Sequence, residues 1–150
     1  MGEVLFYHLT ASTLEQTLPD LLERSLARDW RVVVRARSEA QINALDEKLW
    51  TYRTDSFLPH GNKASGQVAE QPIFLTIGKD TPNDADILML VDGARVDCSE
   101  VERFQRTCLI FNGHEPEALQ AAREDWKSVT NAGLQAKYWA QENGKWLQKA

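Results

Sequence analysis

Short apolar runs along the chain alternate with segments in which apolar residues recur every three to four positions. The runs have the length of strands and consist largely of Val, Ile, Leu and Phe. This pattern is typical of strands that are covered on both faces, as in a parallel sheet flanked by helices. The runs occupy residues 4–7, 31–34, 73–76, 86–91 and 107–111.

The segments between several of these runs have the periodicity of amphipathic helices. Ser38 and Gln41 have the spacing of a capping box, and Pro116 suits the first position of a helix. Helical periodicity covers residues 14–26, 42–49 and 116–129, and residues 132–147 are expected to form a last amphipathic helix.

Residues 51–72 differ from the rest, since they contain Pro59, Gly61 and Gly66 and show no clear period. We interpret them as a long loop, which is uncommon in a compact domain and often functional. The alternation of strands and helices predicts an α/β domain of three layers, with a mostly parallel sheet flanked by helices. A chain of 150 residues fits one such domain, spanning residues 1–150.

Charge restricts the partners that the chain can bind. The net charge is -5 at pH 7 and the pI is near 5.2, whereas a nucleic-acid groove across a whole domain needs many Lys and Arg residues. We therefore expect any contact with DNA to be indirect. The longest apolar run is about five residues, against roughly 20 in a membrane helix. No membrane span is expected, and a cytoplasmic location is the simplest prediction.

A search for catalytic and cofactor motifs finds little. The sequence has no phosphate-binding loop of the GxxxxGK[ST] type, and the first run ends without the glycines of a dinucleotide fingerprint. His8, His60 and His114 are too widely separated for a local metal-binding motif, so neither a metal nor another cofactor is expected. Cys98 and Cys108 do not form a CxxC motif, and we interpret both as free thiols, with Cys108 in a core strand.

Asp92 follows the apolar run at residues 86–91, where α/β enzymes often have a catalytic carboxylate. The alternative is structural, because Asp92 and Gly93 together suit a turn at the end of a strand. An enzyme or a nucleotide-binding protein would have its site at Asp92 and the loop at residues 51–72.

Arg123, Trp126 and Lys127 are spaced to share one face of the third predicted helix. A guanidinium can hold a carboxylate through paired hydrogen bonds, and an indole supplies flat apolar area, so the three could bind an acidic ligand with an apolar end. In the alternative interpretation Trp126 packs inward, and the two cations form a solvated face with Glu124 and Asp125.

Several segments together resemble the chi subunit family of bacterial DNA polymerase III, a component of the clamp-loader assembly. The more specific ones are LDEKLW and SFLPH, at residues 45–50 and 56–60, and AREDWK at residues 122–127, which is followed by Gly133. The resemblance covers most of the chain. It implies a Rossmann-like α/β fold and a non-catalytic adaptor.

In this family one surface receives the acidic, Phe-terminated carboxyl tail of single-stranded DNA-binding protein. A second surface receives the psi subunit, which links chi to the clamp loader. The resemblance places Arg123, Trp126 and Lys127 on the tail-binding helix, with Leu119 where a basic residue is expected one turn earlier.

The same resemblance places Trp50 and Phe57 at positions that contact psi. In the alternative interpretation these two aromatic residues close the core beneath the long loop.

The last predicted helix departs from the family pattern and is rich in aromatic and basic residues, which could form a partner surface or pack internally. Two other functions stay open: a nucleotide-binding α/β enzyme, and a helicase or repair adaptor on the same fold. The residues concerned are Lys137, Tyr138, Trp139, Lys145, Trp146 and Lys149.

Overall fold

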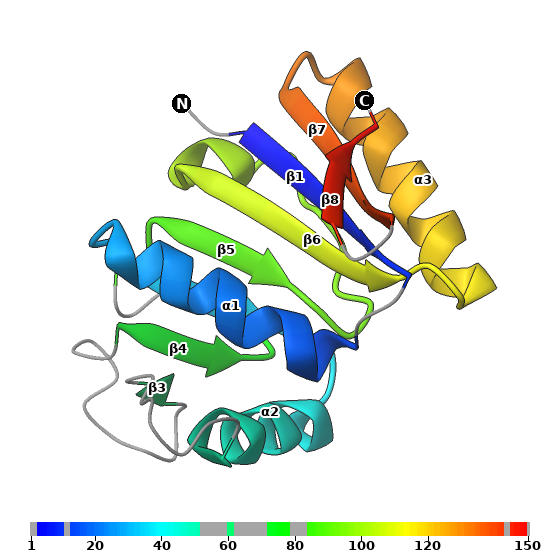
Figure 1. Ribbon diagram of the computed structural model, residues 1–150. Helices are drawn as coiled ribbons and strands as arrows, with labels where there is room; N and C mark the ends of the chain where they lie inside the picture. Colours follow the sequence, from blue (N-terminus) through cyan, green and yellow to red (C-terminus); the bar gives the residue numbers. More distant parts are fainter. Residues whose placement is uncertain are drawn as a thin grey trace.

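The computed structural model describes residues 3–10, 13–51, 60–61, 72–78, 84–142 and 145–149, and its ribbon is shown in Figure 1. The elements follow one another in the order β1 (Glu3–Leu9), α1 (Leu14–Ala27), β2 (Val32–Arg35), α2 (Glu39–Thr51), β3 (His60–Gly61), β4 (Ile73–Thr76), β5 (Ile87–Leu90), the 3-10 helix η3 (Val101–Arg103), β6 (Arg106–Asn112), α3 (Pro116–Asn131), β7 (Gln135–Glu142) and β8 (Lys145–Gln148).

The strands form one eight-stranded sheet in the order β3-β4-β2-β5-β6-β1-β7-β8. The described strands pair in parallel from β3 to β7, and β8 runs antiparallel to β7. Every residue of β2, β4 and β5 is buried, as the nearly continuous apolar runs predict. The mostly parallel sheet is therefore confirmed.

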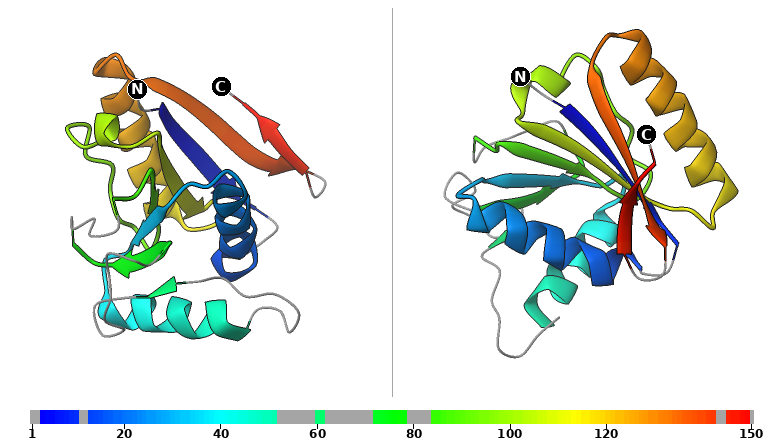
Figure 2. Two further views of the ribbon diagram at one scale, coloured as in Figure 1. Left: turned by 90° about the vertical axis from the view of Figure 1, so that its left-hand side faces the viewer. Right: turned by 45° about the horizontal axis from the view of Figure 1, so that its top comes forward.

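Helices cover the sheet on both faces. Leu18 of α1 and Leu45 of α2 pack in one apolar cluster, together with Leu5 of β1. Phe6, the next residue of β1, points to the opposite face and packs in a second cluster with Val129 of α3. Figure 2 shows α3 on one side of the sheet and α1 on the other. The three-layer α/β architecture is confirmed.

The starts of the helices follow from local chemistry. Ser38 precedes α2, and its hydroxyl accepts a hydrogen bond from the backbone N–H of Gln41 at 3.2 Å. Pro116 is the first residue of α3, as predicted. For α1 the cap is Thr13, which forms a capping box with Gln16. None of the helices in the described ranges has the length and apolar composition that crossing a membrane requires.

The prediction of a last helix over residues 132–147 is wrong. Most of this segment forms β7 and β8, which pair with each other as an antiparallel hairpin. Gly133 follows the end of α3 with φ of 77°, the left-handed conformation that commonly ends a helix. β7 then pairs along β1, a contact across more than a hundred residues of sequence that local periodicity does not reveal.

Candidate functional site

The position of α3 is fixed by an ion pair on one of its flanks. Asp125 is only 3% exposed, and its carboxylate accepts hydrogen bonds from the guanidinium of Arg95 at 2.9 and 3.0 Å. The same carboxylate accepts the backbone N–H of Val96 at 3.2 Å. Hydrogen bonding to Asp125 is the main reason that the pKa of Arg95 is raised. These contacts tie α3 to the segment that follows β5.

The opposite flank of α3 has exposed positive charge. Residues two positions apart lie about 200° apart around a helix, so Arg123 and Lys127 project away from the side on which Asp125 is buried. Both side chains are exposed. Within the part of the chain that the structure describes, neither forms an ion pair with a carboxylate. Glu124 turns instead toward Arg95, at 3.4 Å.

Trp126 lies between this basic flank and the core. The indole is half-buried, and it meets the ring of Phe6 edge to face with a centroid separation of 5.3 Å. It meets the ring of Tyr138, on β7, in the same manner at 5.9 Å. The interpretation in which Trp126 packs inward is therefore confirmed in part, because the indole contacts the core but stays partly exposed.

His8 and Tyr138 extend the site across the sheet. The Tyr138 hydroxyl lies 2.8 Å from Nδ1 of His8, and the imidazole stacks on Phe111 with a centroid separation of 5.1 Å. Burial lowers the pKa of His8, and the positive charges of His114 and Arg123 lower it further. Burial raises the pKa of Tyr138, and Arg123 opposes that shift. Arg123 is therefore an electrostatic neighbour of both side chains.

The structure thus brings Arg123, Trp126 and Lys127 together on one helix, as the sequence predicts. The interpretation in which both acidic neighbours share the same solvated face is wrong, because Asp125 is buried against Arg95. Leu119, one turn before Arg123, is half-buried and packs against the same apolar cluster as Trp126.

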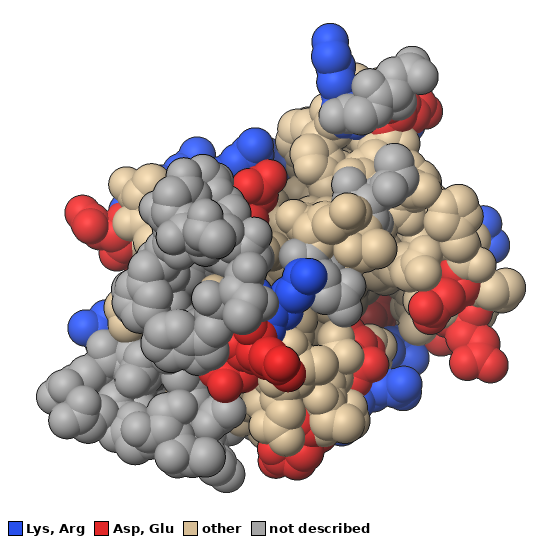
Figure 3. All heavy atoms as spheres, turned by 60° about the horizontal axis from the view of Figure 1, so that its bottom comes forward, with Lys and Arg blue, Asp and Glu red and all other residues tan. Residues whose placement is uncertain are grey.

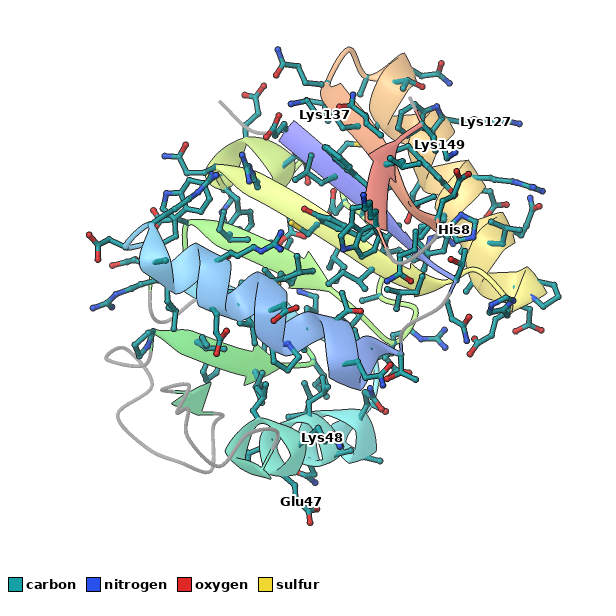
Figure 4. The ribbon with its side chains drawn as sticks, in the orientation of Figure 1. His8, Glu47, Lys48, Lys127, Lys137 and Lys149 are labelled. Carbon is teal, nitrogen blue, oxygen red and sulfur yellow. The ribbon has the colours of Figure 1, made fainter. Side chains whose placement is uncertain are left out.

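Figure 4 shows how the labelled residues are distributed. Lys127 extends outward from α3, and His8 and Lys149 lie on the same side of the molecule in this view. Glu47 and Lys48, from the LDEKLW segment, lie on α2 at the other end of the molecule. The predicted psi contact Phe57 and the side chain of Trp50 lie outside the described residues, although the backbone of Trp50 belongs to α2.

Asp92 forms the turn that the sequence predicts. It has φ of 53° and is followed by Gly93 with φ of 76°, and its carboxylate lies 3.2 Å from the hydroxyl of Ser38. A cleft of about 670 Å³ opens beside it, at the carboxyl ends of β1, β5 and β6. Ligands of α/β proteins often bind at this edge of a sheet. Both arginines that line this cleft are bonded to protein oxygens: Arg37 donates to the carbonyl of Asp92, and Arg95 pairs with Asp125.

Other chemical features are sparse. Among the described residues, no group of three or more His, Cys, Asp or Glu side chains could hold a metal ion. Cys98 and Cys108 are free thiols, and burial of Cys108 in β6 raises its pKa to about 12. On the face shown in Figure 3, acidic and basic side chains are interspersed outside the grey atoms.

Tyr138 and His8 are not predicted from the sequence as parts of this site. Tyr138 joins it because residues 135–142 form a strand in which Tyr138 pairs with Phe6 of β1. A signal for this existed, because the Asn-Gly pair at residues 143–144 is a strong sequence indicator of a hairpin turn.

The fold and site define a three-layer α/β domain with a small basic and aromatic surface on its third helix. The chain matches the family described as DNA polymerase III chi subunit, HolC, over residues 1–137, and it therefore belongs to this family. β8 lies beyond the matched residues.

Two curated relatives are similar. A "Probable DNA polymerase III subunit chi" of Rickettsia prowazekii (strain Madrid E) is 30% identical over 91 residues, which span 61% of this chain and 55% of the relative. The "DNA polymerase III subunit chi" of Pseudomonas aeruginosa PAO1 is 28% identical over 113 residues, which span 75% of this chain and 76% of the relative. The chain thus spans little more than half the length of the first relative.

Proposed function

We propose that the protein is a non-catalytic adaptor of the bacterial replicative DNA polymerase III holoenzyme. Its α3 surface binds the acidic carboxyl-terminal tail of single-stranded DNA-binding protein, so the protein reaches DNA indirectly. A psi-type partner binds elsewhere on the chain and connects it to the clamp loader in the cytoplasm. Membership of the chi subunit family supports this role.

One observation carries the tail-binding proposal. Arg123 and Lys127 have no carboxylate partner among the described residues, and the half-buried indole of Trp126 lies beside them. An acidic tail would supply the missing carboxylates, and its apolar end would add contact area near the indole. A net charge of -5 repels bare DNA, whereas a local basic patch can still attract a short acidic peptide.

Trp50 and Phe57 are the proposed contacts of the psi-type partner. This assignment rests on the match of the LDEKLW and SFLPH segments to the family, at residues 45–50 and 56–60. A helicase or repair protein could use the same two aromatic residues. Affinity capture of the intact protein from its own organism distinguishes these partners, because each would be identified by mass spectrometry.

A peptide titration tests the tail site. A fluorescent acidic peptide that ends in phenylalanine should bind the wild type with a Kd in the micromolar region, which corresponds to a binding free energy of about -8 kcal/mol. Binding should be weaker at high salt. Arg123→Ala should weaken binding about tenfold, since a charge-assisted hydrogen bond is lost. The matched control is Arg24→Ala, an exposed arginine of α1 on the opposite face of the sheet. Unchanged affinity in Arg123→Ala at low salt would contradict the proposed site.

The cleft beside Asp92 supports a second candidate, nucleotide binding at the carboxyl edge of the sheet. A nucleotide that binds the folded protein raises its Tm, and the rise grows with the logarithm of ligand concentration above the Kd. Thermal unfolding with and without millimolar ATP and deoxynucleotides tests this candidate. We expect no shift, because the two arginines that line the cleft, Arg37 and Arg95, are already bonded to protein oxygens and are not free to hold a phosphate. A concentration-dependent rise in Tm would favour the nucleotide-binding function.

A further inference from the structure

A row of paired residues crosses the last three strands of the sheet, from β1 through β7 to β8, on the face that α3 covers. His8 of β1 pairs with Ala140 of β7, and Ala140 pairs with Leu147 of β8. Directly paired residues point to the same face of a sheet, with Cβ atoms about 5 Å apart. His8 follows Phe6 by two residues, and Phe6 packs with Trp126 of α3. Leu147 therefore faces the side of the sheet on which α3 lies.

Apolar side chains stand on both elements, α3 and β8. Leu147 is 42% exposed and is one of two large apolar side chains that stand exposed among the described residues. Leu119 lies on the α3 flank that faces β7, seven residues or about 10 Å before Trp126. Ala140 lies two residues, or about 7 Å, beyond Tyr138, the residue of β7 that meets Trp126, so Leu119 and the Ala140–Leu147 pair lie within about one helical turn of the same level.

The charges on this part of the surface are mostly positive. Arg123 and Lys127 project from α3, and Lys145 and Lys149 share the face of β8 that presents Leu147, since residues two apart point the same way. The backbone N–H of Lys149 donates to the carbonyl of Tyr138, and the ring of Tyr138 in turn contacts Trp126. Glu142 is the carboxylate on this face of the hairpin, and it pairs with Lys149.

We propose that the β7–β8 hairpin forms a second wall of the docking site, and that an acidic peptide with an apolar carboxyl end lies across the surface between α3 and β8. The acidic residues of the peptide lie against Arg123 and Lys127, and the apolar end packs on Leu147 and Leu119. This inference rests on the proposed tail-binding function. Because β8 lies beyond residue 137, this wall is built from a part of the chain outside the family match.

A substitution at Leu147 tests the second wall. The probe is a fluorescent peptide with several aspartates and a carboxyl-terminal phenylalanine, titrated against the full chain at low salt. Leu147→Asp should weaken binding about tenfold, since an apolar contact is lost and a negative charge is added. Ile77→Asp is the matched control, because Ile77 is the other exposed large apolar side chain, at 46%, and follows β4 on the far side of the sheet. It should bind as the wild type does.

A second peptide ending in serine separates a local effect from a general one. For the wild type, the peptide ending in serine should bind about tenfold more weakly than the peptide ending in phenylalanine. For Leu147→Ala, the affinities of the two peptides should differ by at most about twofold. An equal loss in both proteins overturns the inference, as does wild-type affinity in Leu147→Asp. If Arg123→Ala loses binding while both Leu147 variants retain it, the second wall fails and the tail site stands. If neither peptide binds the wild type, the proposed function fails first.

Discussion

Asp125 lies buried beneath the guanidinium of Arg95, and this pair joins the middle of α3 to the segment that follows β5. The pair fixes the rotation of α3 about its own axis. With Asp125 held on one flank, Arg123 and Lys127 must project from the other, toward the edge formed by β7 and β8. An ion pair outside the proposed site therefore determines which charges the site presents.

Replacing this carboxylate should loosen α3. Asp125→Asn leaves the shape of the side chain but removes its charge, so the bonds from Arg95 and Val96 weaken. We expect a loss of about 1.5–3 kcal/mol in the free energy of unfolding, measured by urea denaturation. Glu124→Gln makes the same change in charge at the neighbouring exposed residue and should stay within about 0.5 kcal/mol of the wild type. Equal effects of the two substitutions would show that burial of Asp125 does not matter.

An ion pair in which both partners are buried should be more sensitive still. Arg35, at the end of β2, donates to Glu100 at 2.7 and 3.1 Å, and both side chains are less than a tenth exposed. Glu100→Leu leaves the guanidinium without its carboxylate in the interior and should lower the free energy of unfolding by about 3–5 kcal/mol. The double variant Arg35→Met/Glu100→Leu should recover most of that loss. A double variant no more stable than Glu100→Leu alone contradicts this account of the pair.

The stability of the protein should fall in mild acid, partly because of His8. Burial, followed by the charges of His114 and Arg123, holds the pKa of His8 below its ordinary value of 6.5. The unfolded chain then binds a proton more readily than the folded one as the pH falls below 6.5, so the free energy of unfolding decreases. Thermal unfolding between pH 7 and pH 5 should show a smaller decrease for His8→Gln than for the wild type. If stability decreased equally with pH in the wild type and in His8→Gln, His8 would not contribute to the acid sensitivity.

Binding of the psi-type partner should be separable from tail binding. Trp50→Ala and Phe57→Ala should each abolish co-purification with a clamp-loader partner, because an aromatic anchor is lost from the proposed interface. Both variants should bind the acidic peptide with the affinity of the wild type. Circular dichroism provides the control, since loss of the folded spectrum would instead support the interpretation in which these residues close the core.

The sequence predicts the interior of this fold well. The runs at residues 73–76 and 107–111 are nearly continuous in apolar residues, and they form β4 and part of β6, which are covered on both faces. Pro116 marks the start of α3 because its missing N–H costs nothing at that position. Local chemistry decides both kinds of element, so local patterns suffice to predict them.

The edge of the sheet and the setting of the site could not be predicted in the same way. Tyr138 and Trp139 suit a strand, but the spacing of apolar residues around them also fits a helix, and pairing with distant β1 decides between the two. Asp125 likewise looks like a solvated helix residue until Arg95, 30 positions earlier, is brought against it. Contacts between distant residues determine both features.

Nuclear magnetic resonance of the tryptophan side chains tests the central claim most directly. The chain has five tryptophans, and each indole N–H gives its own signal. Trp30 is an internal control, because it packs in the apolar cluster on the opposite face of the sheet from Trp126. On titration with the acidic, phenylalanine-ended peptide, the Trp126 signal should shift in a saturable and salt-sensitive manner while the Trp30 signal stays in place. A Trp126 signal that does not move at saturating peptide would contradict the account.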